Sequence, residues 1–174
     1  GMLAGDGLLS GNLGRTIRGS RQAVHDTRLA IRWLTDKGYT RIGLMGFSIG
    51  SSVTSLTASH DARVRALACV HLSGDFGGFV WTGTATRHIR DAIDGDIDLA
   101  DLKAVWSVIS PISYASKLAH LRTPTLVLSG THDDVILPYL TREVIDAYSE
   151  HGVPYQWRKL PCGHHTIGQP PFAL

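Results

Sequence analysis

A serine, an aspartate and a histidine occupy positions from which they could together form a nucleophilic catalyst. Ser48 is the central residue of a Gly-x-Ser-x-Gly segment, Asp133 comes three residues after a glycine, and His164 directly follows another glycine. A serine hydroxyl is a weak nucleophile at neutral pH, so it needs a histidine to accept its proton and a carboxylate to orient that histidine. In these roles Ser48 would attack an acyl carbon, His164 would act as base and then as acid, and Asp133 would hold His164.

The acid and the base each have an alternative in the sequence. Asp134 is the neighbour of Asp133, and Asp75 follows a different apolar segment, so either could supply the carboxylate. His165 is the alternative to His164 as the base. The remaining histidines are scattered without the spacing of metal ligands, and we therefore expect no metal site and no cofactor.

Apolar segments typical of buried strands alternate with segments typical of helices. A helix begins near Ser20 and stops at Gly38, and residues 1–19, which are rich in glycine, are expected to form an irregular arm. This alternation predicts an α/β fold with a mainly parallel sheet in one domain, residues 1–174. The expected strands are 41–47, 66–72, 125–129 and 155–160, and the other expected helices are 50–59, two segments within 86–110, and 138–151.

The three candidate catalytic residues each follow one of these expected strands. Carboxyl ends of parallel strands meet at one edge of the sheet, so Ser48, Asp133 and His164 can converge there. The Ser48 segment joins a strand to a helix, which is the context that a nucleophile elbow requires. Such a tight turn needs small flanking residues, and glycine occupies both flanks.

These motifs resemble those of the α/β-hydrolase superfamily. The resemblance rests on the segments Gly-Phe-Ser-x-Gly, Gly-x-x-Asp and Pro-Cys-Gly-His, in that order, and extends from about Asn12 to Phe172. It implies a three-layer α/β sandwich and the Ser48–Asp133–His164 triad. The full fold has eight strands, of which this sequence contains the last four, so we expect a partial domain that lacks the N-terminal strands.

The resemblance also implies an oxyanion hole and an apolar acyl pocket. The backbone N–H of Ile49 would be one oxyanion donor, whereas the loop that supplies the second donor has no counterpart ahead of the Ser48 motif. Phe47, Phe76, Trp81 and Leu137 are candidates for the pocket, although aromatic and aliphatic residues of this kind are equally typical of a core.

Composition excludes several classes of partner. The net charge is +2 and the charges are interleaved, so nothing favours nucleic-acid binding. No apolar run approaches the roughly 20 residues needed to cross a bilayer, so no membrane association is expected. Two cysteines do not make a disulfide framework, which favours a reducing compartment and a cytoplasmic location.

Two functions remain open at this stage. The first is a serine hydrolase acting on a small ester or related acyl compound. The second is a truncated remnant with weak or no activity that serves as an interaction module, because one oxyanion donor is missing. The strand 41–47 would also lack its usual neighbour, so we expect either the arm 1–19 or a second copy in a homodimer to cover it.

Overall fold

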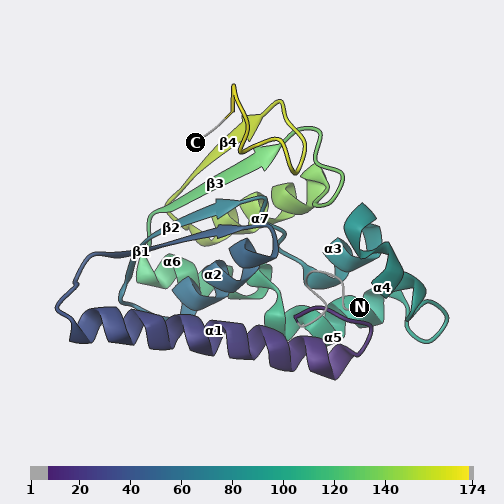
Figure 1. Ribbon diagram of the computed structural model, residues 1–174, viewed down its shortest axis with the longest axis horizontal. Helices are drawn as coiled ribbons and strands as arrows, with labels where there is room; N and C mark the ends of the chain where they lie inside the picture. Colours follow the sequence, from purple (N-terminus) through teal and green to yellow (C-terminus); the bar gives the residue numbers. More distant parts are fainter. Residues whose placement is uncertain (1–7, 173–174) are drawn as a thin grey trace.

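The computed structural model describes residues 8–172, which form a four-stranded parallel sheet and its helices (Figure 1). The strand order is β1-β2-β3-β4, and all three neighbouring pairs are parallel. The α/β prediction is therefore confirmed. The strands are β1 Ile42–Phe47, β2 Val64–Val70, β3 Thr125–Gly130 and β4 Tyr155–Leu160; the helices are α1 Leu13–Asp36, α2 Ile49–His60, α3 Phe76–Thr82, α4 Arg87–Asp91, α5 Leu99–Trp106, α6 Ala115–Leu121 and α7 Pro138–His151, with short 3-10 turns η1 Thr84–Thr86, η2 Ser107–Ile109 and η3 Pro111–Tyr114.

Helices α1, α2, α6 and α7 form a layer on one face of the sheet, while α3, α4 and α5 lie beyond its carboxyl edge (Figure 1). The main core fills the space between this layer and the strands, and Leu67, Val127 and Tyr148 are among its buried members. A second apolar cluster, which includes Phe76 and Trp106, holds α3 and α5 together. The carboxyl edge of the sheet therefore faces a packed group of short helices.

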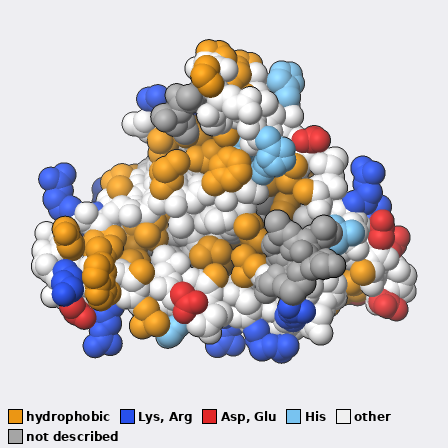
Figure 2. Space-filling model, viewed as in Figure 1, with side chains coloured by type: hydrophobic (Ala, Val, Ile, Leu, Met, Phe, Trp, Pro, Cys, Tyr) orange, Lys and Arg blue, Asp and Glu red, His pale blue; other side chains and the backbone are white. Residues whose placement is uncertain are grey.

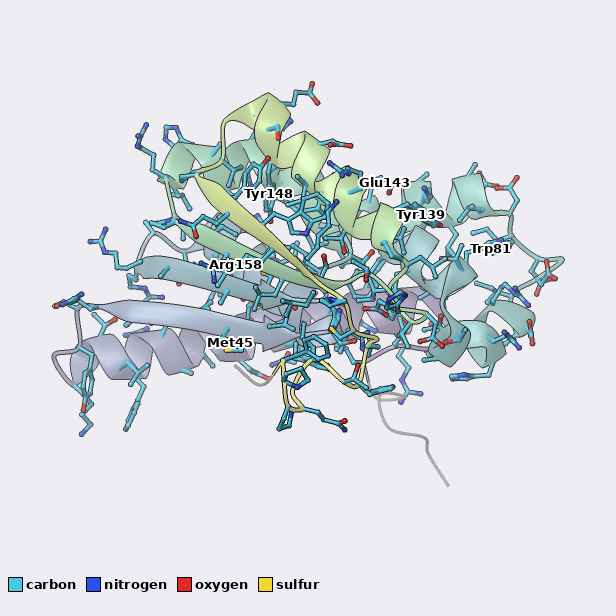
Figure 3. All side chains as sticks on the ribbon, turned by 90° about the horizontal axis from the view of Figure 1, so that it is seen from above. Met45, Trp81, Tyr139, Glu143, Tyr148 and Arg158 are labelled. Carbon is cyan, nitrogen blue, oxygen red and sulfur yellow. The ribbon has the colours of Figure 1, made fainter. Side chains whose placement is uncertain are left out.

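The opposite face of the sheet carries no helix in the described part of the chain. Figure 3 shows α7, which carries Tyr148, on one side of the strands and Met45 of β1 on the other. Met45 is 65% exposed, and hydrophobic side chains gather over the strands on this face (Figure 2). The described residues therefore supply two of the three layers that the resemblance implies.

The first helix begins earlier than the sequence predicts. α1 starts at Leu13, so the expectation of an irregular arm over 1–19 is wrong for residues 13–19, and residues 1–7 lie outside the described part of the chain. The Asn12 side chain caps the helix by accepting a hydrogen bond from the Arg15 N–H at 2.9 Å. Thr16 and Ser20 are buried on this helix, and tertiary packing of this kind outweighs the low helix propensity of the two glycines at positions 14 and 19.

No helix among residues 8–172 combines the length and the apolar character required to cross a membrane.

Among residues 8–172, β1 is an edge strand, because it pairs with β2 alone. Since an apolar edge is a template for another strand, we propose that a second copy of the chain covers it. Replacing the exposed Met45 by lysine should then shift the protein from dimer to monomer in sedimentation experiments, because a buried charge opposes pairing. Trp33→Lys, which changes an exposed aromatic residue on α1, should leave the dimer intact. A wild-type protein that sediments as a monomer at all concentrations would contradict the proposal.

Candidate active site

Ser48 stands on a sharp turn between a strand and a helix. β1 ends at Phe47 and α2 begins at Ile49, so Ser48 is the single residue that connects them. Its backbone has φ 53° and ψ −125°, a conformation that residues with a side chain rarely adopt. The Ser48 N–H donates a hydrogen bond to the carbonyl of Val70 at 2.9 Å, which ties the turn to the end of β2. This is the geometry of a nucleophile elbow.

Gly46 allows the turn at Ser48 to close. A Cβ at this position would overlap the carbonyl group of Gly50 and lie 2.5 Å from Thr54 Oγ1. By contrast, a Cβ at Gly43 on the same strand would meet its nearest neighbour at 3.7 Å, an ordinary contact. The requirement for glycine is thus specific to the position two residues before the serine.

Gly46→Ala is expected to destabilise the protein by at least about 2 kcal/mol, because α2 must move away from β1 to admit the methyl group. Gly43→Ala is the matched control and should change the stability by less than about 0.5 kcal/mol. Thermal unfolding followed by circular dichroism measures both. Equal unfolding temperatures for the two variants would show that the close approach at Gly46 is not required.

The structure brings Ser48, His164 and Asp133 into one chain of hydrogen-bonding contacts. Ser48 Oγ lies 3.0 Å from His164 Nε2, and His164 Nδ1 lies 2.9 Å from Asp133 Oδ2 and 3.0 Å from Oδ1. With the His164 proton on Nδ1, that nitrogen donates to the carboxylate and Nε2 accepts the serine hydroxyl. His164 and Asp133 are both buried. The arrangement can therefore take a proton from Ser48 and hold the resulting imidazolium beside a carboxylate.

The surroundings of Asp133 keep it ionised. Its Oδ1 also accepts hydrogen bonds from the backbone N–H groups of Val135 at 2.9 Å and Ile136 at 2.8 Å, just ahead of α7. Burial by itself would raise the pKa of Asp133, but the hydrogen bonds from His164 and from the backbone, together with the close contact of His71, outweigh it and hold the pKa well below its usual range. Asp133 is thus a permanent negative charge at neutral pH.

A second histidine contacts the same carboxylate, and the sequence did not single it out. His71 follows β2 directly, its side chain is 0% exposed, and its Nδ1 lies 2.6 Å from Asp133 Oδ2. The rings of His71 and His164 are 4.6 Å apart between centroids. Its position directly after a buried strand is the sequence feature that could have identified it, because Ser48 and Asp133 also follow strands.

His71, Asp133 and His164 are also the described residues whose donor atoms cluster closely enough to suggest a metal ion. Two ligands of one tetrahedral zinc ion lie about 3.3 Å apart, given bonds of about 2.0–2.1 Å. The facing atoms here lie 2.6 to 2.9 Å apart, which is hydrogen-bonding distance. The geometry therefore favours a proton-transfer chain over a metal site.

The alternative acids and the alternative base lie elsewhere. Asp75 caps α3 by accepting from the Gly77 N–H and pairs with Lys103 at 2.8 Å. Asp134 is exposed, and its backbone carbonyl accepts a hydrogen bond from the Thr84 hydroxyl. His165 is exposed and sits edge-on to the ring of His164, with 5.1 Å between centroids. Of these groups, none bridges Ser48 to a carboxylate among the described residues.

A small apolar pocket of about 260 Å³ opens beside Ser48 and His164. Phe47 lines it, as the sequence predicts, whereas Phe76, Trp81 and Leu137 do not. Phe76 is buried in the cluster with Phe79 and Trp106, because α3 turns Phe79 rather than Phe76 toward the site. Trp81 and Leu137 pack against the same cluster. The remaining lining residues are Leu9, Ile49, Phe79, Ala85, Thr86, His88, Ile89, Val135 and His165.

Ile49 occupies the first position of α2, so its backbone N–H is one of the groups that a helix N-terminus leaves unpaired within the helix. This is the position from which an elbow enzyme stabilises an oxyanion. Ahead of β1, the part of the chain described here contains α1 and the short segment 8–12, and no strand-and-loop unit that could carry a second donor.

The fold is shared with several solved hydrolase structures. It matches a puromycin-hydrolyzing peptidase of Mycobacterium tuberculosis with a TM-score of 0.67 at 21% identity, over 82% of this chain and 22% of that one. It matches the acylaminoacyl peptidase of Pyrococcus horikoshii with a TM-score of 0.68 at 13% identity, over 82% of this chain and 23% of that one. An esterase of Pyrococcus furiosus matches with a TM-score of 0.62 at 15% identity, over 83% of this chain and 54% of that one.

The chain thus spans about a fifth of the two peptidases and about half of the esterase. A comparison with curated protein sequences gave no match. Together with a family match, these structures confirm the resemblance to the α/β-hydrolase superfamily, and the chain covers part of that fold. Residues 16–173 match the prolyl oligopeptidase family, and because this is nearly the whole length, the chain belongs to that family.

Proposed function

We propose that this chain carries the nucleophile, base and acid of a serine hydrolase that cleaves an ester or related acyl compound. The observation that carries the proposal is the pair of contacts of His164, whose Nε2 lies 3.0 Å from Ser48 Oγ and whose Nδ1 lies 2.9 Å from Asp133 Oδ2. Membership of a peptidase family supports hydrolase chemistry in general. The ester substrate and the acyl-serine intermediate are the finer part of the proposal.

The proposed reaction has two halves. Ser48 Oγ attacks the acyl carbon while His164 Nε2 takes the hydroxyl proton, and His164 then gives that proton to the departing alcohol. The acyl group stays on Ser48. A water molecule loses a proton to His164 and attacks the acyl carbon, the bond to Ser48 Oγ breaks, and Ser48 regains its proton. Asp133 remains ionised throughout and holds His164 with its Nε2 toward the serine.

Transition-state charge on the acyl oxygen would be met by the N–H of Ile49 at the start of α2. A backbone donor aimed at a developing oxyanion is one of the strongest catalytic contributions, and the loss of one donor costs about 100- to 1000-fold in kcat. Because the described residues contain no second oxyanion loop, we expect a lower turnover than two donors would give.

The pocket beside Ser48 supports a short apolar acyl group. Its volume of about 260 Å³ is below the roughly 300–1,000 Å³ of sites for drug-sized ligands. Phe47, Phe79 and Ile89 make its walls mostly apolar, which suits an uncharged acyl chain. Acetyl to butyryl esters are therefore the first substrates to test, followed by amides, because two of the structural neighbours are peptidases.

The second candidate, a remnant that binds partners without turnover, is favoured by one observation. The described sheet has four strands, and β1, which leads to Ser48, lies at its edge, where another chain can pair with it. The chemistry of Ser48 separates the two candidates, because a remnant has no need of an activated hydroxyl.

A fluorophosphonate probe tests the proposal, because it reacts with a serine only when a base activates it. The wild-type chain is expected to gain one probe adduct that mass spectrometry maps to Ser48, and Ser48→Ala should gain none. Competition by p-nitrophenyl butyrate should slow the labelling. Labelling of wild type and Ser48→Ala to the same extent, or of neither, would reject the proposed hydrolase in favour of the remnant.

A further inference from the structure

The backbone at His71 holds a strained conformation at the carboxyl end of β2. Its φ is 55°, in the left-handed region that a residue with a side chain rarely occupies. The His71 N–H donates to the carbonyl of Leu128 at 2.8 Å, so the strand pairing fixes the residue in this conformation. Backbone strain of this kind is unfavourable and is concentrated at functional sites.

The His71 ring is enclosed by the active site. Phe47 meets its ring edge-on with 5.5 Å between centroids, and the His164 ring lies 4.6 Å away at an interplanar angle of 30°. Gly130 of β3 leaves room for the ring, since a Cβ there would approach His71 Cε1 to 3.3 Å and overlap the carbonyl of Cys162. Strands β1 and β3 and the loop after β4 thus all shape the space around this ring.

Among the described residues, the titratable groups that contact His71 are the two triad members, and the Cys162 thiol lies in the field of Asp133. Asp133 approaches His71 from the loop after β3, and His164 approaches from the loop after β4. The thiol of Cys162 is buried, and burial together with the charge of Asp133 raises its pKa, so it stays neutral. β1 contributes Phe47 and no charge. Asp133 is therefore the one anion among the described groups that face the ring.

Among the described residues, Asp133 is the polar partner of the His71 ring nitrogens. Neither nitrogen makes a well-aligned hydrogen bond with a described residue, and the side chain is 0% exposed. Within the described part of the chain, the polar contact of the ring is the close approach of Nδ1 to Asp133 Oδ2, at 2.6 Å. A buried polar group without a partner is costly, so this contact is the physical reason for a histidine at this position.

We propose that His71 is a positioning residue for the catalytic pair, an inference that rests on the proposed function of Ser48. With its proton on Nδ1, His71 places a positive ring edge against Asp133 Oδ2, 2.6 Å from Nδ1, and restrains that oxygen. The carboxylate is then held between Val135 and Ile136 on one oxygen and His71 on the other, with its plane set toward His164 Nδ1.

The same contact should set the acidic limit of activity. The positive end of the His71 N–H withdraws part of the negative charge of Asp133 from His164. Without that N–H, the full carboxylate charge would stabilise protonated His164, and the base would be captured by a proton at a higher pH. Removing His71 is therefore expected to move the acidic limb of the rate profile toward neutral pH.

His71→Phe tests the contact, because phenylalanine keeps the ring and removes the N–H. We expect kcat to fall about tenfold to a hundredfold, as for the loss of one close polar contact to a charged group. KM should change little, because His71 does not line the pocket beside Ser48. The acidic limb of the kcat/KM profile should rise by at least half a pH unit, which a merely structural loss would not produce.

Two amides provide the matched controls. In His71→Asn the amide nitrogen takes the place of Nδ1, and asparagine also tolerates positive φ, so activity and pH profile should stay within about threefold of wild type. In His71→Gln the amide nitrogen moves to the place of Nε2, away from Asp133, and the variant should behave like His71→Phe. If His71→Phe does not fold, the difference between Asn and Gln decides the matter, and equal behaviour of the two would overturn the proposal.

Proton NMR on a Ser48→Ala background separates this inference from the proposed function. The proton between His164 Nδ1 and Asp133 should give a far-downfield signal that moves further downfield when His71→Phe is added, since the carboxylate then has one partner fewer. A shifted signal together with a wild type that no probe labels would reject the hydrolase and retain the positioning role. An unmoved signal and an unchanged pH profile would overturn the role of His71.

Discussion

His164→Ala is expected to lower kcat/KM for a short ester by about 10⁴-fold or more, which is the largest loss expected from any substitution outside Ser48. The imidazole is the group within reach of the Ser48 hydroxyl, at 3.0 Å, so its removal leaves the serine as a weak nucleophile. KM should change far less than kcat, because the proton transfer occurs in the transition state. Steady-state kinetics on p-nitrophenyl acetate and the rate of fluorophosphonate labelling measure the loss.

His165→Ala is the matched control for this experiment. His165 is exposed and contacts the His164 ring at its edge, so its loss removes part of the pocket wall and leaves the base in place. A change within about tenfold is expected. If His165→Ala proved the more damaging substitution, the assignment of the base would pass to His165, and the observed contact of His164 with Ser48 would carry no chemistry.

Asp133→Asn is expected to reduce kcat by about 10⁴-fold while the fold is retained. The amide can donate a proton to His164 Nδ1, which places the ring proton on Nε2, where it faces Ser48 as a donor and cannot accept the hydroxyl proton. Asp134→Asn, the neighbouring control, should keep nearly full activity because its side chain is exposed. Comparable losses in both variants would show that the acid had been assigned to the wrong residue.

Asp133→Asn also tests how the stability of the folded protein depends on pH. Since the pKa of Asp133 is lower in the folded protein than in the unfolded chain, its ionised form stabilises the fold above the ordinary pKa of aspartate, near 4. That contribution is lost as the pH falls through the lower, folded value. The gap in unfolding temperature between wild type and Asp133→Asn should therefore be widest near neutral pH and narrow below about pH 4. A gap that widens in acid would contradict the assigned direction.

Much of the fold could be predicted because its signals are local. The strand ahead of Ser48 is a short apolar run that ends in a glycine-flanked turn, and β1 ends at Phe47 as expected. The strand and helix that flank Asp133 end and begin within one residue of their predicted bounds, at Gly130 and Pro138. The spacing of apolar residues and the turn-forming residues are sufficient to predict such elements, because each element depends on residues that are neighbours in the chain.

The start of α1 could not be predicted in the same way. Six glycines in residues 1–19 indicate an irregular segment, yet helix α1 runs from Leu13. Its first turns are stabilised by burial of Thr16 and by a hydrogen bond from the Trp106 indole N–H to the carbonyl of Leu13 at 3.3 Å. The residues that decide this boundary lie some 90 positions apart in sequence, beyond the reach of any local pattern.

The sequence by itself determined the candidate catalytic residues of this protein: a serine on a tight turn, then an acid and a histidine after later strands of one parallel sheet. Those features depend on residue type, order and local turns. Only the tertiary structure decided what surrounds that chemistry, including the pocket wall formed by Phe79 instead of Phe76 and the second histidine, His71, beside Asp133. The physical reason is that packing of distant strands and helices sets which buried side chains meet, and that spatial proximity leaves no periodic signal in the chain.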